Sequence, residues 1–453
     1  MNIKKSSGIK SLLLVMLFAL PFIYSCKDKE DEGVKTFSLK IQLVYPGELE
    51  SVAGVKVKLQ NTITDDLTEA NTDSDGLAEF TVIAGTYDAS TSETRSVGRD
   101  FILLNGVKTS IIVSDSWTGT PVNLNLAETK TSQLVIKEVY TGGCQKDDGS
   151  GAFQRDPYII LYNNSNQAVS LNNLCFAMVN PYNSNVATNN DYVNGELLYA
   201  SEGWIPAGTG IWTFRQAVSL DPGKQIVIAV NNAIDNTLTY NNSINFANPD
   251  YYCMYDIDIY PNTTYYPAPS EIIPTSHYLK AYHWGAGNAW PLSVNSPAFF
   301  IFTPEGVTPE NFVADADRNN NYNNSTSASN LRKKVPVGWI VDAIEVYTKG
   351  NANNKKRFTP TIDAGYTELT NSQGYTLYRN VNKEATESIA ENTGKIVYNY
   401  SHGTANDEIN GTTDPSGIDA EASIKNGAHI IYKDTNNSSD DFHQRNRASL
   451  RGE

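Results

Sequence analysis

Tyrosines are concentrated between Asn248 and Glu271, and this stretch carries the side chains most suited to binding a ligand. Its six tyrosines are Tyr251, Tyr252, Tyr255, Tyr260, Tyr265 and Tyr266. A tyrosine ring has a flat apolar face and a polar tip, which suits stacking on sugars or aromatic ligands, and loops commonly carry binding residues. The sequence therefore predicts a ligand surface here. The alternative is that these rings pack a long insertion onto the rest of the fold.

Two groups of polar residues have the side-chain types that bind metal ions. Asp315, Asp317 and Asn319 place oxygen atoms at alternate positions, an arrangement that suits calcium. The glycine and the terminal glutamate of a standard calcium loop are missing, so a solvated asparagine-rich loop is the alternative. His277 forms the second group with the pair Asp256 and Asp258, and a structural role is favoured for it. We therefore predict no cofactor, with calcium as the alternative.

Known catalytic motifs are missing from the sequence. It has no His-Glu-x-x-His zinc motif, no glycine-rich phosphate loop, no His, Asp and Ser in a known catalytic order and no motif with paired carboxylates. We therefore predict that the protein is not an enzyme. A catalytic site assembled from residues far apart in the chain is the alternative.

The N-terminus has the parts of a signal peptide. Three lysines lie within the first ten residues, and the apolar run Leu12–Tyr24 follows them. A membrane-spanning helix needs ~20 consecutive apolar residues, so this shorter run fits a cleaved signal better. The run leads into Ser25 and Cys26, which resemble the bacterial lipobox. That resemblance implies that residues 1–25 are removed and that Cys26 carries the lipid.

Residues 26–35 are strongly charged and are expected to form a solvated tether. A lysine followed by acidic residues directly behind the lipidated cysteine resembles the surface-export signal of Bacteroidota lipoproteins. The resemblance implies that the protein is anchored in the outer membrane and faces the cell exterior. An outer-membrane lipoprotein that faces inward is the alternative.

The composition narrows the class of partner. The chain has 453 residues, with 35 Lys and Arg against 50 Asp and Glu, which gives a formal net charge of −15. Such an acidic protein repels phosphate backbones, so nucleic acid is not expected as a partner. The length suggests two or three domains with buried cores.

Three cysteines remain after Cys26 is assigned to the lipid, and an odd number cannot all pair within one chain. Export permits disulfides. Cys144 and Cys175 flank strands of one predicted sheet, so they are the candidate pair. The alternative is that Cys144, Cys175 and Cys253 are all unpaired and buried.

The first domain is expected at residues 36–128. Thr36–Val44 alternates between apolar and polar residues, with Phe37, Leu39, Ile41 and Val44 marking one strand. Turn residues and further short strands follow. The motif residues are Thr72, Asp73, Gly76, Ala78, Phe80, Gly85 and Tyr87. This order resembles the transthyretin-like, carboxypeptidase-regulatory-like domain, which implies a seven-stranded β-sandwich acting as a spacer.

The second domain is expected at residues 132–453, after a polar linker at 127–131. Strand-like segments recur along it, and they are Leu134–Tyr140, Tyr158–Ser165, Leu220–Ala229, Ile340–Ile344 and Gly374–Arg379. Their order resembles the lamin-tail domain, an immunoglobulin-like sandwich. Ile160 stands where that family has an acid, so any role of that acid is in doubt here. Long insertions at 230–297 and 319–334 enlarge the domain.

The whole layout predicts an all-β protein of two β-sandwich domains. It resembles an uncharacterised family of large Bacteroidota surface lipoproteins, whose genes commonly lie near TonB-dependent outer-membrane receptors. The resemblance implies a surface binding or accessory protein that works with such a β-barrel receptor and takes a glycan or a metal chelate. The alternative is an adhesive or structural surface protein that binds host or matrix glycans or proteins.

Overall fold

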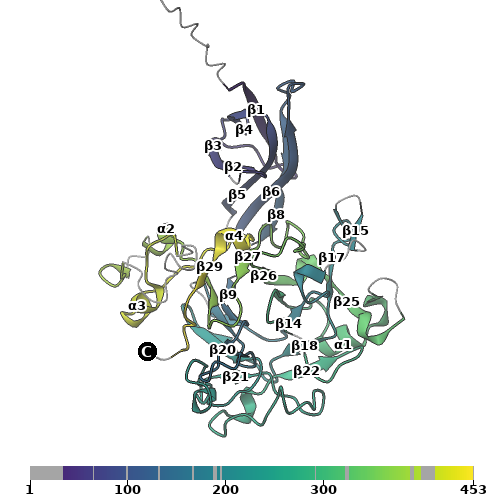
Figure 1. Cartoon of the computed structure of the whole chain (residues 1–453), viewed down its shortest axis with the longest axis vertical. Coiled ribbons are helices and arrows are strands. Elements are labelled where there is room, and N and C mark those ends of the chain that lie inside the picture. Colours follow the sequence, from purple (N-terminus) through teal and green to yellow (C-terminus); the bar gives the residue numbers. More distant parts are fainter. Residues whose placement is uncertain are drawn as a thin grey trace, which may run out of the picture.

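The computed structural model has two β-rich domains, a smaller one near the N-terminus and a larger one below it (Figure 1). It describes residues 34–64, 66–97, 100–130, 133–165, 168–186, 191–193, 196–290, 292–321, 326–387, 392–398 and 414–451. The predicted signal peptide, Cys26 and the tether up to residue 33 lie outside these ranges. Within them, no helix combines the length and apolar character needed to cross a bilayer.

The smaller domain is a sandwich of two sheets, as expected for an all-β chain. The first sheet has the order β4 (Leu77–Ile83), β1 (Thr36–Val44), β7 (Val122–Asn125). The second has the order β3 (Leu67–Asn71), β2 (Lys56–Asn61), β5 (Gly85–Val97), β6 (Asp100–Val113), β8 (Ala127–Lys130). Alternate residues of β1 face the core between these sheets. Leu43 is buried there, while Val44 at the end of the strand is 37% exposed.

The segment expected to be a linker is instead part of this sandwich. Residues Ala127–Lys130 form β8 and pair antiparallel with Ile102–Asn105 of β6. The hairpin of β5 and β6 is long enough to extend toward the larger domain (Figure 1). This overhang leaves the far edge of β6 with unpaired backbone groups, and β8 covers them. The domain therefore has an eighth strand in its described part, where seven were expected.

The larger domain is built on two six-stranded sheets. One has the order β21 (Tyr252–Cys253), β20 (Gln225–Ala229), β12 (Tyr158–Asn163), β9 (Leu134–Tyr140), β28 (Thr376–Arg379), β29 (Phe442–Arg445). The other has the order β22 (Lys280–His283), β18 (Gly210–Thr213), β14 (Cys175–Met178), β23 (Ala298–Phe302), β26 (Ile340–Thr348), β27 (Thr367–Leu369). Residues such as Ile136, Phe176, Trp212 and Ile301 form the main core.

Smaller elements surround these sheets. A three-stranded sheet has the order β17 (Trp204–Ala207), β25 (Leu331–Pro336), β24 (Asn319–Asn321). Two-stranded pairs are β10 (Cys144–Gln145) with β11 (Ala152–Phe153), β13 (Val169–Ser170) with β19 (Ser219–Leu220), and β15 (Tyr192–Val193) with β16 (Glu196–Leu197). The short helices are α1 (Pro309–Ala314), α2 (Lys383–Glu387), α3 (Ala420–Lys425) and α4 (Ser438–Asp441).

The central strands are buried on both faces, which explains their nearly continuous apolar sequences. Ile160 shows the effect. It lies on the outer face of its sheet, where it packs with Phe246 of the first insertion. Its cross-strand partner is Glu138, whose buried carboxylate accepts hydrogen bonds from the Tyr158 hydroxyl at 2.6 Å and the Ser449 amide at 3.0 Å. The apolar residue at position 160 therefore fits a sheet whose outer face is covered.

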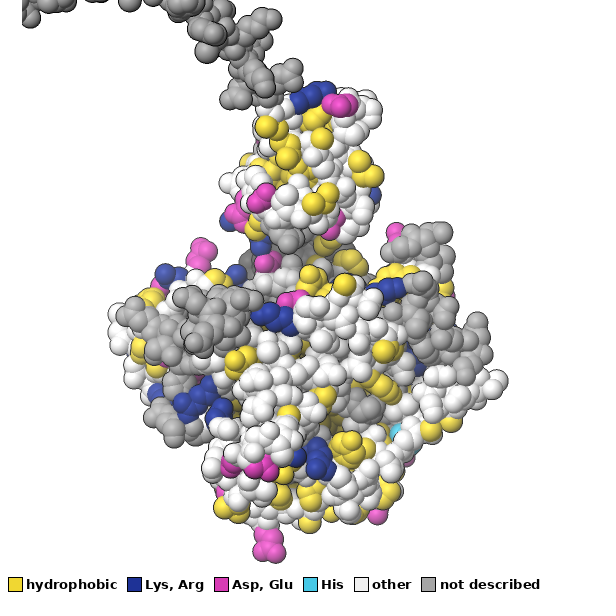
Figure 2. Space-filling model, in the orientation of Figure 1, with side chains coloured by type: hydrophobic (Ala, Val, Ile, Leu, Met, Phe, Trp, Pro, Cys, Tyr) yellow, Lys and Arg dark blue, Asp and Glu magenta, His cyan; other side chains and the backbone are white. Residues whose placement is uncertain are grey.

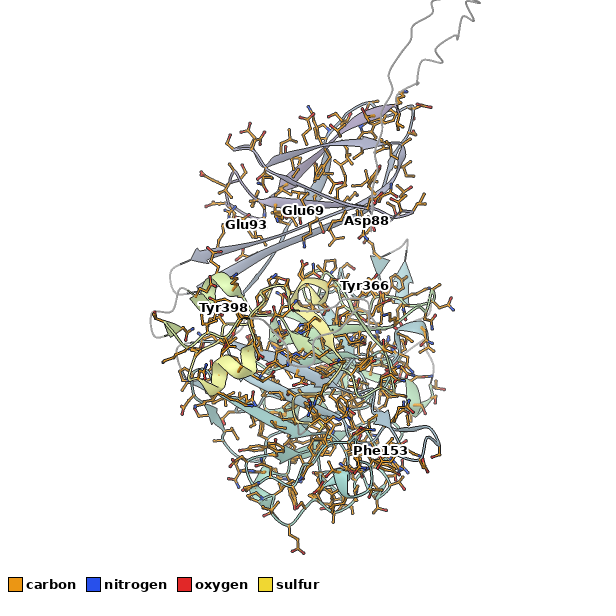
Figure 3. The ribbon with its side chains drawn as sticks, turned by 60° about the vertical axis from the view of Figure 1, so that its left-hand side comes forward. Glu69, Asp88, Glu93, Phe153, Tyr366 and Tyr398 are labelled. Carbon is orange, nitrogen blue, oxygen red and sulfur yellow. The ribbon has the colours of Figure 1, made fainter. Side chains whose placement is uncertain are left out.

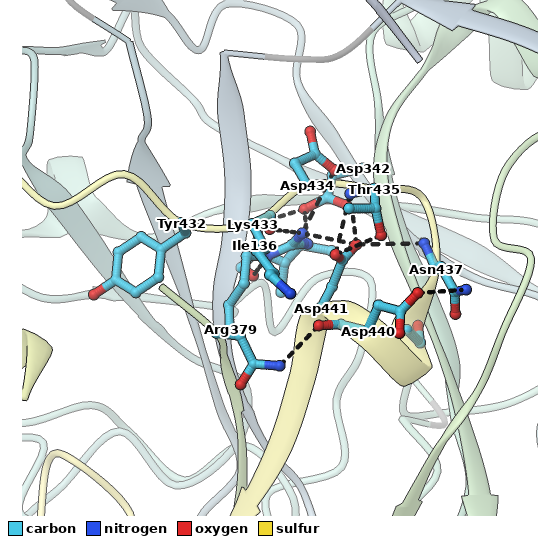
Figure 4. Close-up of polar contacts among 12 residues, drawn as sticks. Ile136, Asp342, Arg379, Tyr432, Lys433, Asp434, Thr435, Asn437, Asp440 and Asp441 are labelled. Carbon is cyan, nitrogen blue, oxygen red and sulfur yellow. Dashed lines mark hydrogen bonds and ion pairs between the residues drawn. The ribbon is translucent and has the colours of Figure 1, made fainter. Parts of the chain in front are cut away.

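Arg379 organises a buried group of charges at the junction of β26, β28 and α4 (Figure 4). Its guanidinium lies 2.5 Å from Asp342, 3.5 Å from Asp434 and 3.6 Å from Asp441. Burial raises the pKa of Asp441 to about 6, and the Arg379 charge opposes that rise. Because one cation serves three acids, Arg379 holds three separate segments of the chain together.

A second buried acid stands without a cation in direct contact. One carboxylate oxygen of Asp156 accepts hydrogen bonds from the Ser243 hydroxyl at 2.6 Å and the Tyr140 hydroxyl at 3.3 Å, and the other has no protein partner. Burial raises the pKa of Asp156 to about 6. The neutral carboxyl therefore suits this site better than the carboxylate.

Replacing Arg379 tests whether its charge stabilises the three buried acids around it. Arg379→Met should lower the free energy of unfolding by about 3–5 kcal/mol, because it leaves buried carboxylates without their counter-charge. The loss should be smaller at pH 5 than at pH 8, since protonation removes the repulsion between the acids. Urea denaturation at both pH values measures this. Arg318→Met is the control, because Arg318 is partly exposed and its ion pair should contribute about 1 kcal/mol at most. Equal stability of Arg379→Met and Arg318→Met would contradict the role of Arg379 as the counter-charge of the buried acids.

Asp156 predicts a pH effect of defined sign. Its pKa rises on folding, so the stability it contributes is fully present below about pH 4 and is lost as the pH rises past about 6. Asp156→Asn stays neutral, so the variant should gain up to about 3 kcal/mol relative to the wild type between pH 4 and pH 8. Thermal denaturation across this range measures the difference. The exposed Asp221→Asn is the control, and parallel curves for the wild type and Asp156→Asn would rule the effect out.

Candidate functional site

A cavity of about 920 Å³ lies where the smaller domain meets the larger one. Its lining comes from both domains: Val107, Thr109, Tyr192, Glu196, Leu197, Ala200, Tyr347, Asn354, Lys355, Lys356, Phe358, Thr359, Pro360 and Ala364. The molecule is narrow at this junction, as Figure 2 shows. Pockets that bind small ligands commonly have volumes of about 300–1,000 Å³ and lie between domains. We therefore take this junction cavity as the candidate site.

The elements around the cavity are set by the two folds. Strand β6 of the smaller domain supplies Val107 and Thr109. The larger domain supplies the pair β15–β16, the end of β26 at Tyr347, and the irregular segment 354–364. The two walls thus belong to independent hydrophobic cores.

An ion pair fixes the irregular segment from behind. The Arg357 guanidinium lies 2.8 Å from the Glu345 carboxylate, and both side chains are fully buried. Glu345 also accepts hydrogen bonds from the backbone amides of Arg357 and Phe358, at 2.9 and 3.0 Å. The guanidinium donates further to the carbonyl oxygens of Tyr182 and Ser296. This pair therefore gives a segment without regular structure a defined position.

The ammonium group of Lys356 points toward two acidic side chains. Its Nζ lies 3.8 Å from Glu345 and 3.9 Å from Asp363, and it donates to the carbonyl oxygen of Gly365. Burial raises the pKa of Asp363, and the Lys356 charge opposes that rise. The positive charge of Lys356 is thus largely balanced within the protein.

Two aromatic rings in the cavity are held in fixed orientations. Tyr347 stacks on Tyr366 with ring centroids 4.0 Å apart and planes at 15°. Tyr366 is 43% exposed and lies at the end of the larger domain that faces the smaller one (Figure 3). The Tyr192 hydroxyl donates to the backbone oxygen of Lys356, and Lys355 Nζ lies 5.6 Å from the centre of the Tyr192 ring. Burial raises the pKa of Tyr192 and of Tyr347, so both are neutral phenols at physiological pH.

Helix α4 connects the cavity to the smaller domain. Asp440 on this helix forms an ion pair with Lys58 of β2, at 2.7 Å. The neighbouring Ser439 hydroxyl donates to the carbonyl oxygen of Tyr366, and the Ser438 hydroxyl donates to Asp363. A short helix therefore contacts the smaller domain, the exposed tyrosine and the acid behind Lys356.

The tyrosine-rich stretch lies elsewhere and is largely structural. Tyr260 and Tyr266 are buried in the main core, where their ring centroids lie 5.4 and 5.9 Å from that of Trp212. These two rings cannot stack on a ligand, so their assignment as ligand-binding residues was wrong. Tyr252 stacks on His277 at 4.0 Å. The alternative, that the tyrosines pack an insertion onto the sandwich, describes these residues.

The remaining tyrosines divide between packing and exposure. Tyr251 and Tyr255 are half-buried against the core under the first insertion. Tyr265 is 43% exposed. None of the six lines the junction cavity. The tyrosine-rich stretch therefore lies apart from the junction cavity.

Asp256 and His277 each have structural partners. Asp256 pairs with Arg215 at 2.9 Å and accepts a hydrogen bond from the Ala281 amide at 3.0 Å. His277 Nδ1 lies 3.1 Å from the carbonyl oxygen of Tyr251. Across the described part of the chain, no three His, Cys, Asp or Glu side chains gather as metal ligands. The structural interpretation of these two residues fits these contacts.

The residues of the predicted calcium loop also have other roles. Asp315 accepts a hydrogen bond from the Asp317 amide at 3.0 Å and forms an ion pair with Arg318 at 3.2 Å. It thereby caps a short helical turn. Asn319 begins β24 and pairs with Lys333. The Asp315 carboxylate therefore takes part in a cap and an ion pair, and these contacts favour the asparagine-rich loop over the calcium loop.

Cys144, Cys175 and Cys253 are all free and buried, so the predicted disulfide between Cys144 and Cys175 is wrong. The first lies on β10, close to Asp156, and the second lies on β14 in a different sheet. Burial raises the pKa of Cys144 and of Cys253 to about 12. The thiols therefore behave as small apolar side chains, as the alternative interpretation held.

Comparisons with known proteins place the chain among others of similar sequence. The DUF4876 family, described as protein of unknown function, matches residues 221–449, half of the 453 residues. A crystal structure of a DUF4876 family protein from Bacteroides thetaiotaomicron VPI-5482 has 21% identity and a TM-score of 0.49, over 89% of this chain and 94% of that one. A DUF3823 family protein from Parabacteroides merdae ATCC 43184 has 14% identity and a TM-score of 0.15, over 32% of this chain and 66% of that one. No curated protein matches. The matched residues show that this chain belongs to the DUF4876 family.

Proposed function

We propose that this protein is a lipid-anchored cell-surface binding protein, and that it captures a ligand in the junction cavity. The observation that carries the proposal is the cavity itself, about 920 Å³ in volume and lined by both domains. Its walls offer aromatic rings, hydroxyl and amide groups, and few charges. These groups suit recognition of a ligand rather than its chemical conversion.

The N-terminal sequence supports the surface location in this proposal. The apolar run and the Ser25-Cys26 pair fit a lipoprotein signal, and the charged tether behind them fits export to the outer face of the outer membrane. Two or three acyl chains on Cys26 would give firm anchoring, since each buried CH₂ contributes ~0.8 kcal/mol. We also propose that the protein hands its ligand to a TonB-dependent β-barrel receptor.

The order of the strands supports finer domain assignments, which we also propose. The smaller domain would be a transthyretin-like spacer, because the motif residues Ala78 and Phe80 lie on β4, and Gly85 and Tyr87 begin β5. The larger domain would be a lamin-tail-like sandwich, because β9, β12, β20, β26 and β28 lie on the matching segments. In this arrangement the spacer holds the larger domain away from the membrane.

Changing the lipidated cysteine tests the anchor and the partner. Cys26→Ala should move the protein from the outer-membrane fraction to the soluble fraction, because the thiol is the only attachment point for the diacylglycerol. Cys253→Ala is the matched control and should stay in the membrane, since that thiol is buried. Protease digestion of intact cells should remove the wild-type protein. Affinity purification of the wild-type protein from detergent-solubilised membranes should also recover a TonB-dependent β-barrel. Recovery of the wild-type protein without any β-barrel would argue against the handover.

Blocking the cavity tests ligand capture. The full mature protein should be screened by thermal denaturation against neutral oligosaccharides, ferric chelates and dipeptides. A ligand present at 100 times its Kd stabilises the folded protein by about 2.7 kcal/mol, so at least one class should raise the Tm. Ala200→Trp should abolish that rise by filling the cavity, while Ala314→Trp, at an exposed helix end, should not. A screen in which no class raises the Tm would count against a binding function.

A further inference from the structure

We propose that the junction cavity binds a neutral oligosaccharide longer than one sugar ring. This inference rests on the proposed function, namely that the cavity is a binding site. It adds the chemical class of the ligand and the residues that recognise it. The proposal is carried by the size of the cavity, by the immobilised ring of Tyr192 and by the balance of charge around it.

The cavity is large for a single small ring. At about 920 Å³ it lies near the upper end of the range for small-molecule pockets. It is also open on one side, since lining residues such as Thr109, Glu196 and Ala200 are exposed. A chain of sugar rings fits such a site because some rings can fill the cavity while the rest of the chain extends through its open side.

The ring of Tyr192 is positioned for stacking before a ligand arrives. It is half-buried and is fixed by its hydrogen bond to the backbone of Lys356, whereas Tyr347 is buried, stacks on Tyr366 and forms part of the wall. A rigid ring loses little conformational entropy on binding, so its contact with a sugar face is not offset by an ordering cost. The half-buried Val107 adds apolar surface on the side of the smaller domain, and the buried Phe358 packs behind the opposite wall.

Polar groups at the cavity can form hydrogen bonds with the hydroxyl groups at the edges of the sugar rings. Thr109 from the smaller domain and Glu196 from the larger one supply a hydroxyl and a carboxylate. Asn354 and Thr359 hydrogen-bond to groups of the protein, at 2.8 Å to Thr348 and to Thr361, so they are held in place as wall residues. A ligand with hydroxyls around an apolar face matches this combination.

The charges favour a neutral occupant. Lys356 is balanced by Glu345 and Asp363, and the remaining charged lining residues, Lys355 and Glu196, have opposite signs. The local site is therefore close to neutral within a chain of net charge −15. A polyanionic ligand would be repelled by the protein as a whole, and a cationic ligand would meet Lys355 beside the Tyr192 ring.

The test is calorimetric titration of the full mature protein with neutral oligosaccharides from glucan, mannan and xylan. At least one series should bind, and its longer members should bind more tightly than the monosaccharide. Tyr192→Ala should weaken binding about tenfold through the lost ring contact, whereas Tyr192→Phe should stay close to the wild type. Ala200→Trp should abolish binding without touching the core. Tyr398→Ala removes an exposed tyrosine outside the cavity lining (labelled in Figure 3) and should have no effect.

The outcomes separate this inference from the proposed function. If a ferric chelate or a dipeptide binds in a manner sensitive to Ala200→Trp and no oligosaccharide binds, the ligand class is wrong and the binding function stands. If an oligosaccharide binds equally well to Ala200→Trp and Tyr192→Ala, the inference fails because the sugar site lies elsewhere. If nothing from any class binds, both proposals fail.

Discussion

The ion pair between Arg357 and Glu345 is the interaction on which the candidate site depends. Both groups are fully buried and are surrounded by backbone hydrogen-bonding partners, so neither charge is left unsatisfied. Such a pair is costly to break and adds little net stability compared with an apolar core. Its role here is to hold a segment of the chain in one position. It fixes segment 354–360, which has no regular structure of its own, and so it defines one wall of the cavity.

Arg379 has the same role for the C-terminal part of the chain. It joins Asp342 on β26 to the acids at 434 and 441, and thereby sets the position of α4. The two arginines therefore act on neighbouring segments around the same end of the larger domain. An apolar core could supply the stability, but it would not specify the path of these irregular segments as closely.

The strands could be predicted from the sequence because each is a local pattern. Thr36–Val44 and Leu134–Tyr140 match β1 and β9 in their bounds, since apolar periodicity depends only on neighbouring residues. The pairing of Cys144 with Cys175 was wrong because sequence alone does not say which sheet a strand joins.

The cavity could not be predicted, because no motif spans it. Its residues come from β6, from β15–β16 and from segment 347–364, and they meet only through the packing of two domains. The tyrosine-rich stretch was a strong compositional signal, yet Tyr260 and Tyr266 are buried in the core of an enlarged sandwich. Tyr192 and Tyr347 carry no such signal, since each stands alone in an ordinary strand.

The contact between Lys58 and Asp440 has a mechanical consequence. It is the one ion pair that joins the two domains among the described residues, and its side chains are 33% and 26% exposed. A pair of this kind contributes about 0–1 kcal/mol, which is comparable with thermal energy. The electrostatic contribution to the contact between the domains is therefore small, and it decreases further as the ionic strength rises. A molecule that touches both walls of the cavity would add contacts across this junction that salt does not screen.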